Sequence, residues 1–375
     1  MTATIRGIGT AIPETRLAQD AMRDLVLAQP GMDRLTTRLV RAAFDGSAIE
    51  TRATVLPELT GVTGGLSAFV GPDTGALLSP STGARNAIYA AEAPELARDA
   101  ALRALATAEV DPSTITHVIT VSCTGFVAPG PDYLLVRELG LAPSTARVHI
   151  GFMGCYGAFP ALRTAAAFCA TRPDAVVLVV CVELCSLHLR VPRDVDEAIA
   201  VSVFSDGAAA AVVTAADGPG GRTVLDLEAF STGLVPDGEE DMAWTIGDAG
   251  FEMRLSPSIP RLVGENIEAA VDELLHDRPQ LLRDPARAIS AWAVHPGGRS
   301  VLDRVQSALT LSDAALAPSR DVLREHGNMS SATVLFILQR ILEHRAGPEP
   351  EAVCAMAFGP GITVETALLA KRITG

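Results

Sequence analysis

Three side chains of this sequence, those of Cys155, His295 and Asn328, have the properties that acyl transfer through a thioester requires. A thiol is a nucleophile, an imidazole carries a proton, and an amide N–H stabilises a negatively charged oxygen. Each residue alone also has an ordinary structural explanation, because free cysteine packs like a small apolar side chain and asparagine is common at turns and helix starts. The combination is a hypothesis that depends on where the chain places the three residues.

The surroundings of Cys155 suit a reactive thiol. A predicted strand over residues 146–150 runs through glycines into a predicted helix over 158–170, so Cys155 falls at a sharp turn. Free N–H groups and the helix dipole stabilise a thiolate there, and we expect a thiol pKa below the usual value of about 8.5. The helix is apolar on nearly every face except at Arg163, which predicts a position in the middle of a domain.

Length, composition and charge limit the class of protein. The chain has 375 residues, 48% of them hydrophobic, which is enough for a large core in two or three domains or one large one. No apolar run approaches the ~20 residues that a membrane span needs, and the start lacks the profile of a signal peptide, so we expect a cytoplasmic protein. The net charge of −14 disfavours nucleic acid as a partner.

The cysteines do not suggest a metal site. The six lack CxxC pairs and zinc-ribbon spacing, so we expect them reduced, mostly buried and without a metal. They are Cys123, Cys155, Cys169, Cys181, Cys185 and Cys354.

The hydrophobic pattern predicts a layered α/β fold. A near-continuous Val/Leu run over 175–182 is typical of a strand that is covered on both faces. The glycine-rich segment 217–221 divides the chain into predicted halves, 1–221 with the cysteine and 222–375 with the histidine and asparagine. The other predicted strands are 5–8, 115–122, 146–150, 208–215, 224–230, 288–294 and 353–358, and a final segment over 362–370 follows the last of them. The other predicted helices are 17–28, 33–44, 84–108 (interrupted or kinked at Pro94), 260–276, 301–309 and one ending at 344, with a long loop over 61–83 and another over 231–241.

Polar residues gather where these strands end and helices begin, which is where ligands bind in α/β sheets. Cys155, His295 and Asn328 all lie at such junctions. The chain resembles the type III polyketide synthases, the chalcone-synthase-like enzymes of the thiolase superfamily, over essentially its whole length. The motifs that carry the resemblance are Cys155 at its turn, Val-Phe-Ser-Asp-Gly-Ala-Ala-Ala at 203–210, His-Pro-Gly-Gly at 295–298, Gly-Asn-Met-Ser-Ser at 327–331 and Phe-Gly-Pro-Gly at 358–361.

The resemblance implies a thiolase-like, five-layered αβαβα fold of two similar halves, and a homodimer. It implies acyl-CoA and malonyl-CoA as substrates, with no further cofactor. By position, Cys155 would hold the starter acyl group as a thioester and form an ion pair with His295. His295 and Asn328 would hold malonyl-CoA during decarboxylation, and the resulting enolate would attack the thioester.

The same resemblance assigns a cavity and an entrance. Phe204 matches a gatekeeping aromatic residue, Met253 falls at the second gatekeeping position, and Trp244 stands where many members have a small residue. Cys123, Cys185 and His188 fall at cavity-lining positions. Arg38 and Arg41 are the nearest substitutes for the basic residues that bind coenzyme A in the plant enzymes.

The sequence leaves two hypotheses for the substrate. Cys123 in its Val-Ser-Cys-Thr-Gly-Phe segment resembles bacterial members, including tetrahydroxynaphthalene synthases that use malonyl-CoA only. The segment 154–162 resembles bacterial enzymes that make alkylresorcinols and alkylpyrones from fatty acyl-CoA, and we favour this second reading. Ala357 replaces a glycine of the usual Gly-Phe-Gly-Pro-Gly loop, which weakens inference about the product.

Three other classes compete with a polyketide synthase. A ketoacyl synthase III uses the same three residue types, but the Phe-Gly-Pro-Gly loop and Phe204 argue against it. A cysteine hydrolase would need a local signature that this chain lacks. A noncatalytic scaffold would tolerate the loss of Cys155.

Overall fold

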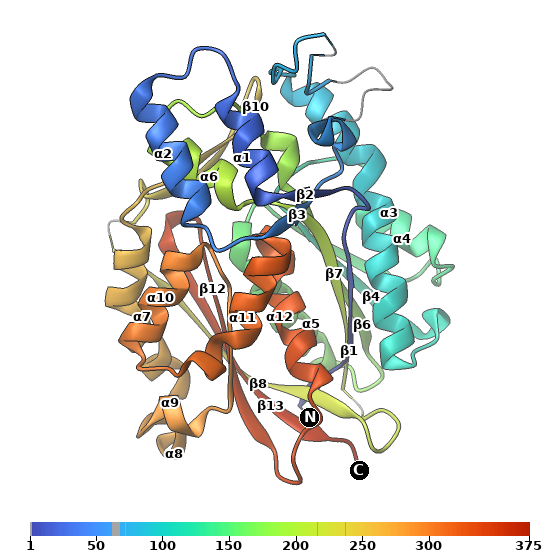
Figure 1. The fold of residues 1–375 in the computed structure, drawn as a ribbon. Helices are drawn as coiled ribbons and strands as arrows, with labels where there is room; N and C mark the ends of the chain where they lie inside the picture. Colours follow the sequence, from blue (N-terminus) through green and yellow to red (C-terminus); the bar gives the residue numbers. More distant parts are fainter. Residues whose placement is uncertain (1, 62–67, 72, 216, 237) are drawn as a thin grey trace.

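The computed structural model describes residues 2–61, 68–71, 73–215, 217–236 and 238–375. Over these residues nine strands join in one mixed sheet, in the order β11-β12-β13-β8-β1-β7-β6-β4-β5 (Figure 1). Their bounds are β1 Ala3–Ala11, β4 His117–Ser122, β5 Ala146–Gly151, β6 Val176–Leu184, β7 Asp206–Thr214, β8 Thr223–Leu234, β11 Ala291–Val294, β12 Glu351–Gly359 and β13 Thr363–Ile373. The two halves of the sheet meet where Ala3, Thr4 and Ile5 of β1 pair with Leu227, Asp226 and Leu225 of β8.

Two helices, α5 (Ala158–Thr171) and α12 (Thr333–Glu343), form the middle layer of the molecule. Alternate strand residues face them from both halves, for example Val177 of β6 and Val353 of β12. The intervening residues face outward, Leu178 into the core beneath α3 (Thr82–Ala108) and Cys354 into the core beneath α7 (Ile259–Leu275) and α10 (Arg299–Ala308). This alternation gives five layers and confirms the predicted αβαβα fold.

Other helices complete the outer layers. The first half carries α1 (Gln19–Leu27), α2 (Arg34–Asp45), α4 (Pro131–Glu138) and α6 (Val195–Val203), and the second half carries α8 (Pro279–Leu282), α9 (Pro285–Ala288) and α11 (Asp313–His326). Short strands β2 (Arg16–Ala18) and β3 (Thr51–Ala53) pair with each other, as do β9 (Met242–Gly247) and β10 (Gly250–Leu255).

Several predicted boundaries were wrong. Helix α3 runs unbroken through Pro94, because the buried helix is held against the sheet by its alanines. Its close approach also explains Gly9, where an added Cβ would lie 2.2 Å from the backbone nitrogen of Ala104. The predicted loop over 231–241 begins inside β8, and neither the β9–β10 hairpin nor α11 was predicted. Residues 62–67 and 72 of the predicted loop 61–83, and residue 237, lie outside the described residues.

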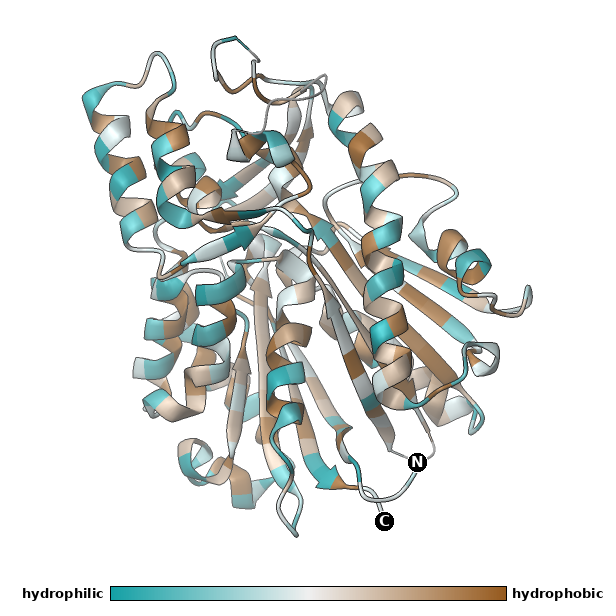
Figure 2. Cartoon of the chain, turned by 45° about the vertical axis from the view of Figure 1, so that its right-hand side comes forward, coloured by the Kyte–Doolittle hydropathy of each residue, from teal (hydrophilic) through white to brown (hydrophobic). Residues whose placement is uncertain are grey.

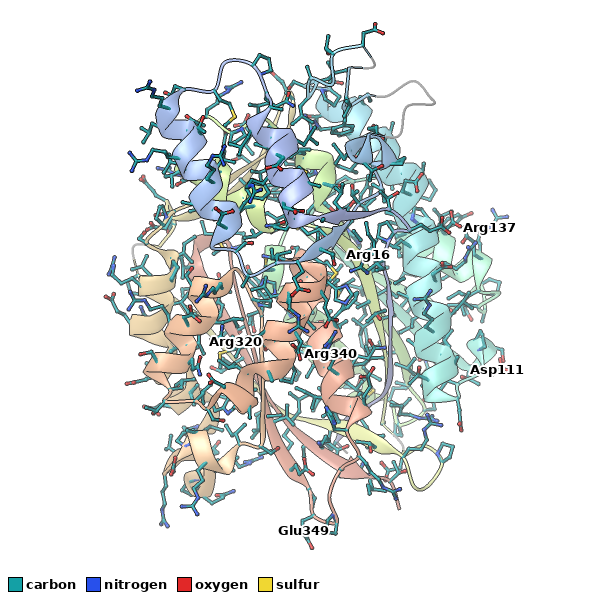
Figure 3. The ribbon with its side chains drawn as sticks, in the orientation of Figure 1. Arg16, Asp111, Arg137, Arg320, Arg340 and Glu349 are labelled. Carbon is teal, nitrogen blue, oxygen red and sulfur yellow. The ribbon has the colours of Figure 1, made fainter. Side chains whose placement is uncertain are left out.

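The surface and the interior differ sharply in polarity. Figure 2 shows hydrophobic residues concentrated in the strands and hydrophilic residues along the outer helices. Figure 3 shows Asp111, Arg137 and Glu349 at the periphery of the molecule. Among the helices in the described part of the chain, none combines the length and apolar character needed to cross a bilayer.

Candidate active site

Cys155 lies in a single 3-10 turn, Gly154–Tyr156, between the end of β5 and the start of α5. The turn needs unusual backbone geometry, since Phe152 and Gly154 have φ values of 61° and 69°. A Cβ at Gly154 would also lie 2.6 Å from Cδ of Pro360, so only glycine fits without displacement. The sharp turn predicted from the sequence is therefore present, and the loop containing Pro360 packs directly against it.

The structure brings the side chain of Asn328 next to the thiol. Both side-chain atoms of its amide lie 3.9 Å from Sγ of Cys155. Oδ1 already accepts a hydrogen bond from the backbone N–H of Ser330 at 2.8 Å, which leaves Nδ2 as the donor toward sulfur. The backbone of Asn328 is fixed to the first half of the chain, because its N–H donates to Val203 O at 2.9 Å and its carbonyl accepts from Ser205 N–H at 2.9 Å.

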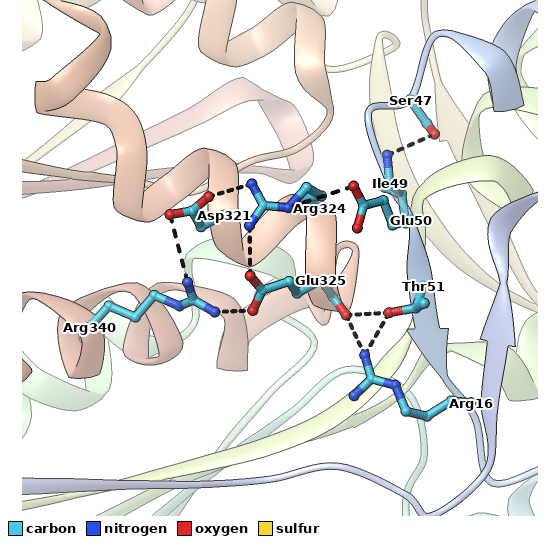
Figure 4. Close-up of polar contacts among 9 residues, drawn as sticks. All are labelled: Arg16, Ser47, Ile49, Glu50, Thr51, Asp321, Arg324, Glu325 and Arg340. Atoms are coloured by element: carbon cyan, nitrogen blue, oxygen red, sulfur yellow. Dashed lines mark hydrogen bonds and ion pairs between the residues drawn. The ribbon is translucent and has the colours of Figure 1, made fainter.

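The end of α11, just before Asn328, is held by a polar network (Figure 4). The side chains of Arg16 and Thr51 donate to the backbone carbonyl of Glu325 at 2.7 and 2.8 Å. The Glu325 carboxylate is itself held by Arg324 at 2.8 Å and by Arg340. Carbonyls at the end of a helix lack partners within it, so these contacts from the first half stabilise the turn that presents Asn328.

His295 follows β11 and is fully buried. Its backbone N–H donates to Met356 O at 2.8 Å, which aligns the residue with the end of β12. Neither ring nitrogen has a hydrogen-bond partner within the described residues, and burial lowers the pKa of His295 to about 3. The imidazole is therefore neutral at pH 7, with a free nitrogen lone pair.

The thiol of Cys155 is also neutral in this structure. Burial, with a smaller contribution from the nearby Glu183 carboxylate, raises its pKa to about 12, against the opposing effects of Ser330 and Asn328. The prediction of a lowered thiol pKa is wrong, because removal from water outweighs the helix start. A preformed ion pair with His295 does not fit two neutral groups.

Cys155 lines one cavity, and a second cavity borders that one. The thiol cavity, of about 40 Å³, is lined by Cys155 and Asn328 together with Gly297, two residues beyond His295. The inner cavity, of about 80 Å³, lies beyond it. Residues common to both linings separate the two spaces, and they are Cys123, Phe204, Trp244, Met253 and Ser330. Four of these five were predicted as cavity residues.

Cys185 and His188, also predicted as cavity residues, line only the inner cavity. His188 is not available for chemistry, because its Nε2 bonds to Thr124 O at 2.8 Å and its Nδ1 accepts from Phe251 N–H at 2.9 Å. Trp244 stands edge-on to this imidazole and donates from Nε1 to Cys123 O at 2.7 Å. The aromatic wall of the inner cavity is therefore fixed by hydrogen bonds to the backbone.

Glu183 was missed at the sequence level, although a charged residue within the apolar strand β6 is a signal. It is fully buried, and burial raises its pKa. Its carboxylate accepts from Cys123 N–H and Thr124 Oγ1, both at 2.9 Å, and from Ser331 Oγ. Glu183 thus ties the Cys123 segment of the cavity wall to the segment that follows Asn328.

The predicted coenzyme A residues Arg38 and Arg41 lie on α2 and are exposed to solvent. They line neither the thiol cavity nor the inner cavity. Within the described ranges no ion pair involves either of them, so both guanidinium groups are available to an anion.

Comparisons with known proteins place this geometry in a family. The model for the N-terminal domain of chalcone and stilbene synthases matches residues 1–217, and the model for their C-terminal domain matches residues 226–373. A curated relative, the probable polyketide synthase 1 of Dictyostelium discoideum, is 30% identical over 372 residues. That match covers 97% of this chain but 11% of the relative, so the chain spans about a tenth of that protein.

Solved structures agree closely with the fold. PKS-I from the brown alga Ectocarpus siliculosus is 30% identical, with a TM-score of 0.90, and the match covers 99% of this chain and 98% of that one. The C-terminal type III polyketide synthase domain of Steely1 from Dictyostelium is 28% identical, with a TM-score of 0.87 and 99% of both chains covered. A type III pentaketide synthase from Neurospora crassa is 27% identical, with a TM-score of 0.86 and 99% and 100% covered.

These relatives come from a slime mould, a brown alga and a fungus, so they do not support the resemblance to a bacterial branch. The resemblance to type III polyketide synthases itself is confirmed. Because the two family models together match nearly the whole length, this protein belongs to the chalcone and stilbene synthase family of type III polyketide synthases.

Proposed function

We propose that this protein is an acyltransferase that extends an acyl group on Cys155 by decarboxylative condensation with malonyl-CoA. The observation that carries the proposal is the 3.9 Å approach of the Asn328 amide to the Cys155 thiol at the floor of a largely apolar cavity. The unpartnered, buried imidazole of His295 supplies the base that such a thiol requires. This reaction draws on coenzyme A thioesters alone, without a metal or an organic cofactor.

In the first step the imidazole of His295 takes the thiol proton, and the Cys155 thiolate attacks the carbonyl carbon of an acyl-CoA. The coenzyme A thiolate leaves with a proton returned by the imidazolium, and the acyl group stays on Cys155. Because burial disfavours charge on both groups, proton transfer and attack are coupled when substrate fills the thiol cavity.

In the second step malonyl-CoA places its thioester oxygen between Asn328 and His295. Loss of carbon dioxide leaves an enolate whose negative oxygen accepts hydrogen bonds from Asn328 Nδ2–H and a His295 ring N–H. The enolate carbon attacks the acyl carbonyl on Cys155, the thiolate leaves, and a β-ketoacyl-CoA two carbons longer is released or loaded again.

For the starter we propose a fatty acyl group, with cyclisation to a resorcinol or a pyrone. The predominantly apolar lining of the inner cavity supports an alkyl chain there. The free volumes of about 80 and 40 Å³ are small, so a long chain requires Phe204 and Met253 to move aside. The alternative is a 1,3,6,8-tetrahydroxynaphthalene synthase that uses malonyl-CoA only, which the small free volumes favour.

A carrier-dependent ketoacyl synthase III is the related alternative, and its diagnostic difference is the acyl donor. We propose that Arg38 and Arg41 bind the phosphates of coenzyme A, since they are exposed cations on an acidic protein. A carrier-dependent enzyme would take its malonyl group from a carrier protein and not from malonyl-CoA.

We also propose a homodimer, a cytoplasmic location and a boundary between domains at residues 221 and 222. Support for the dimer comes from β5, an edge strand of the sheet with largely exposed side chains, and from Phe126, which is 40% exposed. Pairing of this edge with a second copy would cover both features.

The decisive experiment incubates the purified protein with malonyl-CoA and with hexanoyl-CoA, lauroyl-CoA or no starter, followed by mass spectrometry. Cys155→Ala should abolish condensed products, whereas Cys169→Ala, a buried thiol within α5, should retain them. Asn328→Ala should slow malonyl-CoA decarboxylation by about 10²-fold, as the loss of an oxyanion donor does elsewhere. Release of free acids alone, with no condensed product from any starter, would refute the proposal.

A further inference from the structure

The inner cavity contains a charged group that the proposed reaction does not use, the guanidinium of Arg52. This residue lies on β3, is 5% exposed and lines the cavity. Its Nη1 donates to the backbone carbonyls of Val201 at 2.7 Å and Phe204 at 2.9 Å. Its Nε and Nη2 are buried without any hydrogen-bond partner in the described part of the chain.

Other polar side chains of the cavity wall already have hydrogen-bond partners. Thr54 donates to Ser186 at 2.9 Å, Thr124 donates to Glu183 at 2.9 Å, and both nitrogens of His188 bond to the backbone. Among buried side-chain nitrogens and oxygens on described residues of this wall, only the two atoms of Arg52 lack a partner. Among the described residues of this lining, Arg52 therefore holds the unused buried donors, in a wall that is mostly apolar.

The charge of Arg52 is not neutralised by direct contact. The nearby carboxylate of Asp206 raises the pKa of Arg52, but burial acts more strongly and brings that pKa down to about 10. The Asp206 oxygens are taken by the backbone N–H groups of Val55 and Ser186 and by the Ser186 hydroxyl. A buried cation with free donors is costly, and an oxyanion in the cavity would remove that cost.

We propose that Arg52 binds an oxyanion on the chain that occupies the inner cavity. The inference rests on the proposed function and narrows its substrate class. Two sources have the required chemistry: the distal carboxylate of a dicarboxylic acyl starter, and an enolised β-dicarbonyl oxygen of the extended chain. Both present a negatively charged oxygen to a guanidinium that has two nitrogens, Nε and Nη2, with unused N–H groups.

Arg52 also has a structural role, because its bonds to Val201 and Phe204 hold the end of α6. Arg85 provides a matched control for that role. It is 1% exposed, donates to the carbonyls of Leu187 and, at 3.0 Å, Leu189, and leaves its own Nη2 unpartnered. It lines neither cavity.

The test compares wild type, Arg52→Met and Arg85→Met with hexanoyl-CoA and adipoyl-CoA, two starters of equal carbon number. Intact-protein mass spectrometry follows the loading of Cys155, and product analysis with malonyl-CoA follows extension. If the starter carboxylate is the ligand, Arg52→Met lowers kcat/KM for adipoyl loading at least about tenfold and affects hexanoyl loading far less. If the extended chain is the ligand, loading of both is kept and the longest product falls at least about tenfold relative to shorter ones.

Either pattern supports the proposal provided that Arg85→Met does not share it. Equal effects of the two variants, or no change in Arg52→Met, would overturn it. Arg52→Gln keeps an amide donor for the two carbonyls and replaces the methionine variant if that variant does not fold. If the wild type forms condensed products and the Arg52 variants behave like it, only this inference is refuted. If the wild type forms no condensed product, the proposed function is refuted.

Discussion

Trp244 sets the size of the space above the thiol, so shortening it should lengthen the product. A buried tryptophan removes about 150–250 Å² from water, worth about 4–6 kcal/mol at ~25 cal/mol per Å². Trp244 is only half-buried, so about 2–3 kcal/mol applies, and loss of its hydrogen bond to Cys123 O adds about 1 kcal/mol. We expect Trp244→Ala to destabilise the protein by about 3–4 kcal/mol and Trp244→Phe by about 1 kcal/mol.

The effect of these substitutions on product length should depend on the volume of the side chain at position 244 and not on the stability of the protein. Because Trp244 lines both cavities, Trp244→Ala joins them, and mass spectrometry of products from hexanoyl-CoA should show additional extensions. Trp244→Phe should keep the wild-type products. The chain's other tryptophan, the fully buried Trp292, is the control, since Trp292→Phe alters a core and no cavity wall. An unchanged product distribution in Trp244→Ala would refute this account of the cavity.

Two further predictions concern stability. The unfolded chain binds protons on histidine below about pH 6.5, whereas burial lowers the folded pKa of His295 and His188 to about 3. The stability that these two buried neutral histidines contribute should therefore be fully present above pH 6.5 and fall as the pH drops toward 3. His295→Leu should reduce the difference between the free energies of unfolding that urea titrations give at pH 7.5 and pH 4.5. A difference equal to that of the wild type would contradict the lowered pKa of His295. Gly154→Ala combines a positive φ with a 2.6 Å clash against Pro360, so it should lower the midpoint of thermal unfolding well below that of Gly140→Ala, which has a positive φ and open space; equal midpoints would show that the clash is relieved.

Local patterns were enough to predict much of the site. The turn at Cys155 and the junctions at His295 and Asn328 follow from strand ends, glycines and hydrophobic runs, which depend on neighbours in the sequence. The family motifs added the wall residues Phe204 and Trp244, and the structure places both where the two cavities meet.

The features of the site that could not be predicted from the sequence are those that depend on burial. The thiol pKa moved in the direction opposite to the prediction because the desolvation of Cys155 comes from residues far away in the chain. Arg52 looks like a surface residue by type, and only the tertiary structure shows that it lines a cavity. Glu183 stands out within an apolar strand, but only the tertiary structure shows that it ties the cavity wall together. Pro94 was predicted to interrupt or kink the helix, and the interruption is absent because local rules omit the packing that keeps α3 continuous.

The pairing of β1 has a consequence for the order in which the molecule forms during synthesis. Thr4 of β1 pairs with Thr214 on one side and with Asp226 on the other, so the strand must wait for both partners to leave the ribosome. Cys155 emerges before its neighbours His295 and Asn328, and the sheet that joins the two halves closes late. On the proposed mechanism, a nascent chain carries its nucleophile without the groups that would activate it, and acyl transfer would begin only after the second half has folded onto the first.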